Sequence, residues 1–191
     1  MPSDADPLPE PQSIASVRRC DTRWKIEVLA GPNMAHLGQR DPRLFGAIPS
    51  LDALRELILR FAASIGVDAN VFVSDYEGEL LERVHASASV ADGFIVDPGG
   101  LMTVSEAWRH ALQETHKPVV EVCFYNAIAN QEVSVFTPTV IGRAMGLRQY
   151  SYVAALLGLV LSLDDDTFLN PGAPESATVR RGGQPYAFKN Q

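Results

Sequence analysis

Strand signals and helix signals alternate along most of this chain, and no other feature of the sequence limits the possible folds as strongly. Each short run rich in β-branched and aromatic residues precedes a segment whose apolar residues recur at helical spacing. The β-rich runs cover 25–30, 70–75, 93–97 and 118–126, with a possible fifth piece at 132–137, and the helix patterns cover 50–65, 77–87, 104–115 and 152–163. This order predicts βαβ units, and therefore an α/β fold with a central parallel sheet covered on both faces.

The two ends of the chain lack this pattern. Residues 1–22 are rich in Pro, Ser and Asp, which predicts a disordered N-terminal arm, and residues 164–191 are similarly predicted to form a flexible C-terminal tail. The domain itself is expected at 23–163. Because 46% of the residues are hydrophobic, a domain of this size can bury a substantial core.

Charge and apolar runs exclude several classes of partner. A net charge of −7 argues against a nucleic-acid backbone, and the longest apolar stretch, 153–163, is too short to cross a bilayer. The acidic, Pro-rich N-terminus does not have the pattern of a signal peptide. We therefore expect neither nucleic acid nor a membrane as a partner.

Cysteine, histidine and glycine usage bears on location and cofactors. Cys20 and Cys123 lie in unrelated contexts and are expected to stay unpaired, which suits a reducing compartment and predicts a cytoplasmic protein. The 4 histidines show no metal-ligand spacing, and the glycines of "DPGG" do not match G-x-G-x-x-G. Neither a metal nor any other cofactor is expected.

Three polar or glycine-rich loops follow predicted strands, at 31–46, 97–103 and 123–130. In parallel α/β sheets, ligands bind beyond the carboxyl ends of the strands. These loops are therefore expected to build the binding site together.

The same loops resemble those of the type II 3-dehydroquinate dehydratases. The first reads "GPNMAHLGQRDPRLFG" against a family pattern of GPN, LG, R-E-P and a closing Y-G, and "YEGELLERVH" is similar to H-E-G-E-L. "DPGGLMTVS" corresponds to N-P-G-A-Y-T-H-T-S, and "EVCFYN" to E-V-H-I-S-N. The resemblance covers roughly residues 25–163. It implies a flavodoxin-like three-layer sandwich that assembles as a trimer and commonly as a dodecamer.

The resemblance also implies a set of catalytic roles, which this sequence matches only in part. In the family an arginine of the first loop helps to ionise a tyrosine, which removes a proton beside a ketone, while an asparagine and a histidine serve the enolate and the departing hydroxyl. Here the arginine is present as Arg40, but the tyrosine position holds Phe45, the asparagine position Asp97 and the histidine position Cys123. A phenylalanine cannot act as a base, so no efficient dehydroquinate turnover is expected.

The candidate catalytic residues are the groups that the strand-end loops bring together: Arg40, Asp97, Glu121, Cys123 and Tyr125. Arg40 can stabilise an enolate or lower a neighbouring pKa, and Asp97 can act as a base if burial raises its pKa. Glu121, Cys123 and Tyr125 alternate along one strand and so share a face.

The candidate substrate-binding residues line the same loops: Asn33, Phe45, Leu101, Met102, Thr103 and Asn126. Most of the groups that hold a polyhydroxylated acid in the family are apolar or neutral here. Such a lining favours a less polar carbonyl compound as the ligand.

Plainer interpretations of these residues remain open. Cys123 can be a small buried hydrophobe, Tyr125 can pack at a subunit interface, and Asp97 can accept backbone hydrogen bonds in its turn. Arg40 can form an ion pair with Asp41 in the loop.

Three functions therefore compete. The first is an enzyme of the lyase, dehydratase or cyclase type that acts on a less polar carbonyl compound in specialised metabolism. The second is a non-catalytic ligand-binding or regulatory paralogue. The third is a 3-dehydroquinate dehydratase with relocated catalytic groups, which requires Tyr125 to reach the substrate proton.

Overall fold

The computed structural model describes residues 14–169 of the 191-residue chain. Its five strands are β1 (Lys25–Ala30), β2 (Asp68–Val73), β3 (Gly93–Asp97), β4 (Val119–Cys123) and β5 (Gly142–Met145). All pair in parallel, in the order β2-β1-β3-β4-β5. This strand order is that of flavodoxin-like folds, so the predicted α/β class and parallel sheet are confirmed.

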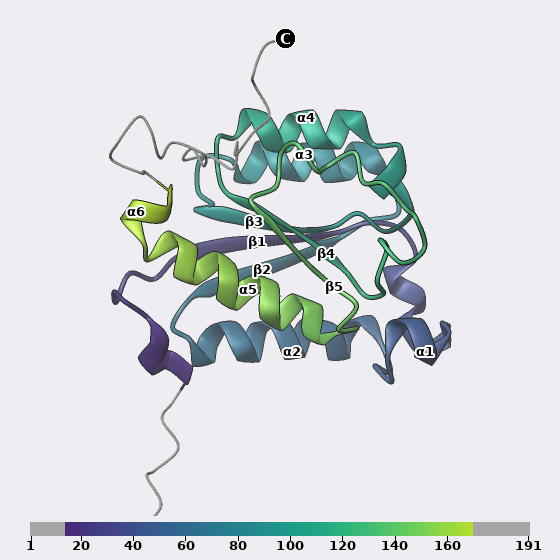
Figure 1. Cartoon of the computed structure of the whole chain (residues 1–191), viewed down its shortest axis with the longest axis horizontal. Coiled ribbons are helices and arrows are strands. Elements are labelled where there is room, and N and C mark those ends of the chain that lie inside the picture. The colour runs from purple at the N-terminus through teal and green to yellow at the C-terminus, as the bar shows by residue number, and fades with distance from the viewer. Residues whose placement is uncertain (1–13, 170–191) are drawn as a thin grey trace, which may run out of the picture.

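Helices cover both faces of the sheet (Figure 1). On one face lie α2 (Leu51–Ser64) and α5 (Tyr150–Leu163), and on the other lie α3 (Glu77–Ser87) and α4 (Glu106–Glu114). Short elements complete the described chain: η1 (Ile14–Val17), η2 (Met34–Gln39), α1 (Pro42–Phe45), η3 (Gly99–Thr103) and α6 (Asp166–Leu169).

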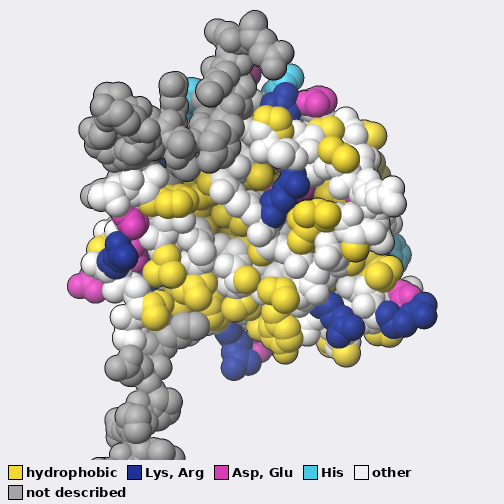
Figure 2. All heavy atoms as spheres, in the orientation of Figure 1, with side chains coloured by type: hydrophobic (Ala, Val, Ile, Leu, Met, Phe, Trp, Pro, Cys, Tyr) yellow, Lys and Arg dark blue, Asp and Glu magenta, His cyan; other side chains and the backbone are white. Residues whose placement is uncertain are grey.

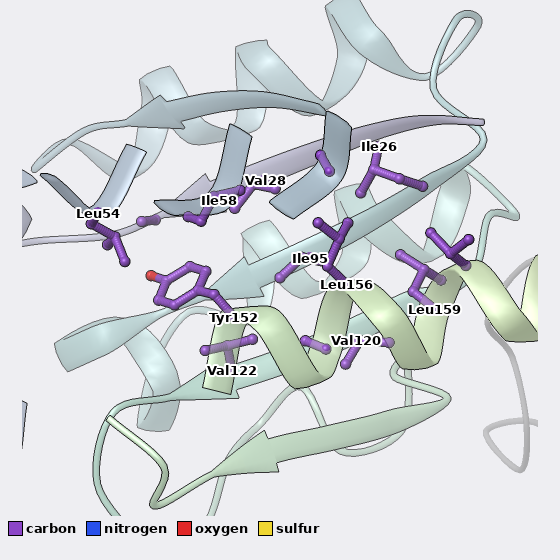
Figure 3. Close-up of a cluster of buried hydrophobic side chains, with 14 of the residues drawn as sticks. Ile26, Val28, Leu54, Ile58, Ile95, Val120, Val122, Tyr152, Leu156 and Leu159 are labelled. Atoms are coloured by element: carbon purple, nitrogen blue, oxygen red, sulfur yellow. The ribbon is translucent and has the colours of Figure 1, made fainter. Parts of the chain in front are cut away.

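The helices form where the sequence carries both an apolar stripe and a suitable first residue. The Ser50 hydroxyl accepts the backbone N–H of Ala53 at 3.1 Å and so caps α2. Leu54 and Ile58 from α2 are fully buried against the sheet and against α5, as Figure 3 shows. Burying each such side chain contributes about 1.5–3 kcal/mol, which fixes α2 beside the loop that precedes it.

The fifth strand was predicted in the wrong place. Residues 132–134 are irregular and 135–139 form a turn, and β5 lies further along the chain at Gly142–Met145. Phe136 packs edge-on against Trp108 of α4, with ring centroids 5.3 Å apart. The backbone N–H of Val135 donates to the carbonyl of Met102 at 2.9 Å. Val135 and Phe136 therefore pack in the core under α4 and hold η3, and the segment does not extend the sheet.

Described parts of the predicted arm and tail contact each other. Arg18 forms an ion pair with Asp164, with Nε and Oδ2 2.6 Å apart, and Cys20 and the Trp24 indole donate to the same carboxylate. Residues 18–20 thus contact residues 164–165 at the end of α5. The remaining residues of the predicted arm and tail lie outside the described part of the chain.

Candidate functional site

The loop after β1 is folded into two short helical turns, η2 and α1. Asp41 begins α1: its Oδ1 accepts the backbone N–H of Arg43 at 2.9 Å, and both of its oxygens accept from the Arg43 guanidinium. Asn33 precedes η2 with φ 71°, a left-handed conformation that asparagine tolerates. Asp41 is therefore paired with Arg43, and the alternative of an Arg40–Asp41 ion pair is wrong.

Arg40 instead stacks on Phe45. The centre of its guanidinium lies 3.5 Å from the ring centroid, which is a cation–π contact. Phe45 is held by two further rings, with centroids 5.6 Å away in Phe124 and 6.2 Å away in Tyr125. Burial lowers the pKa of Arg40, and the nearby Asp97 partly offsets this. The aromatic ring thus provides a rigid platform for a partly desolvated positive charge.

Asp97 ends β3 and is almost fully buried below the same loops. Its Oδ2 accepts the Tyr152 hydroxyl at 2.8 Å, and its Oδ1 accepts the backbone N–H of Gly99 at 3.2 Å. Burial raises the pKa of Asp97 to about 6, against the opposing effects of these two hydrogen bonds and of Arg40. A carboxyl group with such a pKa can exchange protons near neutral pH.

Tyr125 and Cys123 lie close enough to Arg40 to interact with it electrostatically. The Tyr125 hydroxyl donates to Glu132 at 2.7 Å. Burial, and then the hydrogen bond to Glu132, raise the pKa of Tyr125. Burial and Asp97 raise the pKa of Cys123 to about 12. Although Arg40 interacts with both groups, burial and the nearby carboxylates outweigh it, so the pKa of each is raised and both hold their protons at neutral pH.

Glu121, in β4, is more deeply buried than Tyr125. Its carboxylate is 1% exposed and forms an ion pair with Arg143 of β5, with Oε2 and Nε 2.7 Å apart. Burial raises the pKa of Glu121, whereas Ser134 and Arg143 lower it. This pair ties β4 to β5, so Glu121 is suited to positioning the strand end and not to contacting a ligand.

The predicted substrate-binding residues are not all on one surface. Met102 packs with Cys123 and Ala127, whereas Leu101 packs against the core under α3 and α4. The side chains of Thr103, Asn33 and Asn126 are exposed. The Asn33 backbone N–H donates to Asp75 and the Asn126 side chain accepts from Ala129, so both shape their own loops.

The sequence analysis missed two polar residues of this site, Tyr152 and Glu132. Tyr152 lies on the buried face of α5, and Figure 3 shows its ring between α5 and the sheet. Its hydroxyl, however, reaches Asp97 across 55 positions of sequence. A phenol on an otherwise aliphatic stripe was the available signal, because a buried tyrosine hydroxyl needs a partner.

Two further properties concern residues 14–169 only. Within them, no three histidine, cysteine, aspartate or glutamate side chains gather in a way that could hold a metal ion. Nor does this part of the chain contain a helix that is long and apolar enough to cross a membrane.

Comparisons with known proteins agree with this architecture. The family model described as dehydroquinase class II matches residues 24–160. A 3-dehydroquinate dehydratase of Anoxybacillus flavithermus is 34% identical over 136 residues, which is 70% of this chain and 91% of that protein. A 3-dehydroquinate dehydratase of Mycobacterium tuberculosis is 37% identical over 134 residues, 69% of this chain and 90% of its own.

Solved structures give the same result. The type II dehydroquinase of Propionibacterium acnes superposes with a TM-score of 0.68 at 28% identity, over 73% of this chain and 99% of its own. That of Butyrivibrio crossotus gives a TM-score of 0.68 at 26% identity, over 72% and 97%. With the strand order and the site loops described above, these matches show that the chain belongs to the type II dehydroquinase family.

Proposed function

We propose that this protein is a lyase of the dehydratase type that acts on a carbonyl compound less polar than dehydroquinate, with Asp97 as its base. The observation that carries the proposal is the buried Asp97 carboxyl, whose pKa is raised to about 6 within electrostatic range of Arg40. Relatives named 3-dehydroquinate dehydratase support the reaction class. A role in specialised metabolism is part of the same proposal.

The chemistry follows from the charges of the two groups. Asp97, mostly ionised at neutral pH, takes a proton from the carbon beside the substrate carbonyl, and the C–H electron pair forms an enolate that Arg40 stabilises. The enolate then expels a hydroxyl group from the next carbon. Tyr125 still carries its proton, which it transfers to that hydroxyl on breaking its hydrogen bond to Glu132, so that the hydroxyl leaves as water. Before the transfer, Glu132 orients the phenol by accepting this hydrogen bond.

The preference for a less polar substrate comes from the lining. Phe45 is buried in an aromatic cluster, and Met102 packs against Cys123, so these positions offer no group that could hydrogen-bond a ring hydroxyl. A buried hydroxyl without a partner costs about 1–3 kcal/mol. A polyhydroxylated acid therefore loses affinity here relative to a carbonyl compound with fewer hydroxyls.

Deuterium exchange tests the proposal without knowledge of the product. A panel of cyclic and linear ketones is incubated with the protein in deuterated buffer, and NMR follows exchange at the carbon beside the carbonyl. We expect exchange whose rate rises with pH through about 6, the pKa of Asp97. Asp97→Asn should abolish it, whereas Asp52→Asn, on the exposed face of α2, should leave it unchanged. Exchange that survives in Asp97→Asn would rule out this base.

A second candidate function is ligand binding without catalysis. It is favoured by the Tyr125 hydroxyl, which already donates to Glu132, and by the raised pKa of Cys123. Binding of a ketone that shifts the Tyr125 resonances, with no exchange in the wild type, would support this candidate. Turnover of dehydroquinate that is lost in Tyr125→Phe would instead support a dehydroquinate dehydratase with relocated groups.

We also propose that the protein is a cytoplasmic homo-oligomer, a trimer or a dodecamer. Large apolar side chains are exposed near the loops of the site, among them Val104, Ile128 and Val133, which are 67%, 66% and 78% exposed. Figure 2 shows further hydrophobic side chains gathered over the face that carries α5. Light scattering of the purified full-length chain tests the assembly, and a monomer at micromolar concentration would refute it.

A further inference from the structure

A cavity of about 450 Å³ opens beside the aromatic cluster on which Arg40 stacks, since Phe124 and Tyr125 line it. Three segments line it: the end of the first loop around Gly46, the residues just after β4, and the connection from β5 into α5. Tyr125 belongs to both places, because it lines this cavity and also interacts electrostatically with Arg40. A molecule that contacts Tyr125 from the side of Arg40 is therefore adjacent to this cavity.

The charged side chains that line this cavity are both positive. Within residues 14–169 they are Arg43 and Arg148, and no carboxylate of this part of the chain lines it. The Arg43 guanidinium forms an ion pair with Asp41 through some of its N–H groups. Arg148 donates to the backbone carbonyl of Arg43 at 3.3 Å. Among the described residues no carboxylate forms an ion pair with Arg148. In Figure 2, dark blue side chains gather at the corner where Figure 1 places α1 and the start of α5.

The backbone holds Arg148 in place at a conformational cost. Arg148 has φ 55°, in the left-handed region that favours glycine, two residues after Gly146 with φ 84°. Its side chain passes closely over Gly46, where an added Cβ would lie 3.1 Å from the Arg148 Cβ. α5 begins just beyond, so the positive end of its dipole lies at the cavity wall and adds to the charge.

We propose that this cavity binds the anionic group, a carboxylate or a phosphate, of the substrate whose carbonyl end meets Arg40 and Asp97. The inference rests on the proposed function and narrows its substrate class to carbonyl compounds with an acidic arm. Arg148 supplies a guanidinium that forms no ion pair with the described carboxylates, and Arg43 supplies its remaining N–H groups. The two parallel N–H groups of an arginine suit the paired oxygens of either anion. Among the described residues no carboxylate lines the cavity itself, and Asp41 neutralises only part of the charge of Arg43.

Anion binding to the full-length protein tests the inference without any catalysis. Inorganic phosphate and acetate are titrated separately, by calorimetry and by NMR of backbone amides 146–150. We expect one of the two to bind with a dissociation constant on the order of millimolar, and the stronger one identifies the acidic group. Arg148→Gly and Arg43→Gln should each weaken binding at least about tenfold.

Control variants separate binding from folding. Arg148→Gly should melt no earlier than the wild type, because glycine suits φ 55° there. Arg148→Lys keeps the charge and should retain part of the affinity. Arg60→Gln, on the outer surface of α2 and paired with Glu56, should bind as the wild type does. No shift at 146–150 with either anion, or unchanged affinity in Arg148→Gly, would overturn the inference.

The anion-binding test can succeed or fail independently of the proposed lyase reaction. Asp97 does not line this cavity, so Asp97→Asn should still bind the anion. Anion binding without deuterium exchange would reject the lyase and keep the site. Exchange on neutral ketones without anion binding would keep the lyase and reject the acidic arm.

Discussion

Replacing Asp97 by asparagine should stabilise the folded protein at neutral and alkaline pH while removing its proposed base. The carboxyl is buried, and its pKa is about 6 in the folded state against 3.8 for an unperturbed aspartate. That difference of about two pKa units corresponds to about 3 kcal/mol by which ionised Asp97 opposes folding, at about 1.36 kcal/mol per unit. An amide carries no charge to desolvate, so it avoids this cost.

Hydrogen bonding sets the size of the gain. The amide oxygen can still accept from Tyr152, but the contact from the Gly99 N–H is at risk, because the second position of the group becomes a donor. Loss of that bond costs about 1 kcal/mol. We therefore expect Asp97→Asn to raise the free energy of unfolding by about 2 kcal/mol at pH 8.

The pH dependence gives the prediction its sign. Because the folded-state pKa of Asp97 lies above the unfolded one, the folded protein binds more protons between about pH 4 and pH 6. The contribution of Asp97 to wild-type stability therefore falls as pH rises through that window and is constant above it. In Asp97→Asn that fall is absent, so the gain should be smallest near pH 4 and reach its full size by about pH 7.

Urea unfolding of both proteins at pH 4.5, 6 and 8, followed by tryptophan fluorescence, measures the difference. Asp52→Asn is the matched control, because this exposed carboxylate on α2 changes the net charge equally. A variant that is less stable than the wild type at pH 8, or whose gain does not grow with pH, would show that Asp97 is not a desolvated carboxylate. The base assignment would then lose its physical ground.

Three other perturbations follow from the same contacts. Phe45→Tyr combined with Asp97→Asn and Cys123→His restores the residues of the family pattern, and should raise dehydroquinate turnover at least about hundredfold above the parent in a product-absorbance assay. Tyr152→Phe removes the bond that lowers the pKa of Asp97, so the midpoint of the exchange rate should move above pH 6, as a pH profile would show. Asp164→Asn weakens a carboxylate that accepts bonds from Arg18, Cys20 and Trp24, and should cost about 3 kcal/mol in urea unfolding, with an unchanged exchange rate.

Local patterns predicted most of the fold because each element carries its own signal. The predicted helix 77–87 matches α3 at both ends, since Glu77 suits the first turn and Leu80 and Val84 form the buried stripe. β5 escaped detection because Gly142–Met145 contains no β-branched residue. It is a strand because β4 pairs with it, with Cys123 opposite Met145. Such pairing between segments distant in sequence cannot be predicted from the local residue pattern.

The location of the site was predictable from the rule that ligands bind beyond the carboxyl ends of parallel strands, but its chemistry was not. That rule expects Arg40, Asp97, Cys123 and Tyr125 together, and the structure places them within electrostatic range of one another. It does not determine their protonation, which depends on burial and on hydrogen bonds from residues distant in sequence. Tyr152 approaches Asp97 only because α5 crosses the sheet beside β3.

The position of negative charge links the changes at Phe45 and Asp97. A phenol at position 45 could offer Arg40 a negative charge on ionisation, whereas the phenyl ring offers only its π face, 3.5 Å away. The carboxylate of Asp97 now supplies a negative charge from the sheet, and the attraction between the two groups acts on the pKa of both. The base would thereby move from the first loop to the end of a buried strand. A base fixed there by hydrogen bonds from Tyr152 and Gly99 requires the substrate to bring its proton to Asp97, and an acidic arm anchored at Arg148 would set that approach.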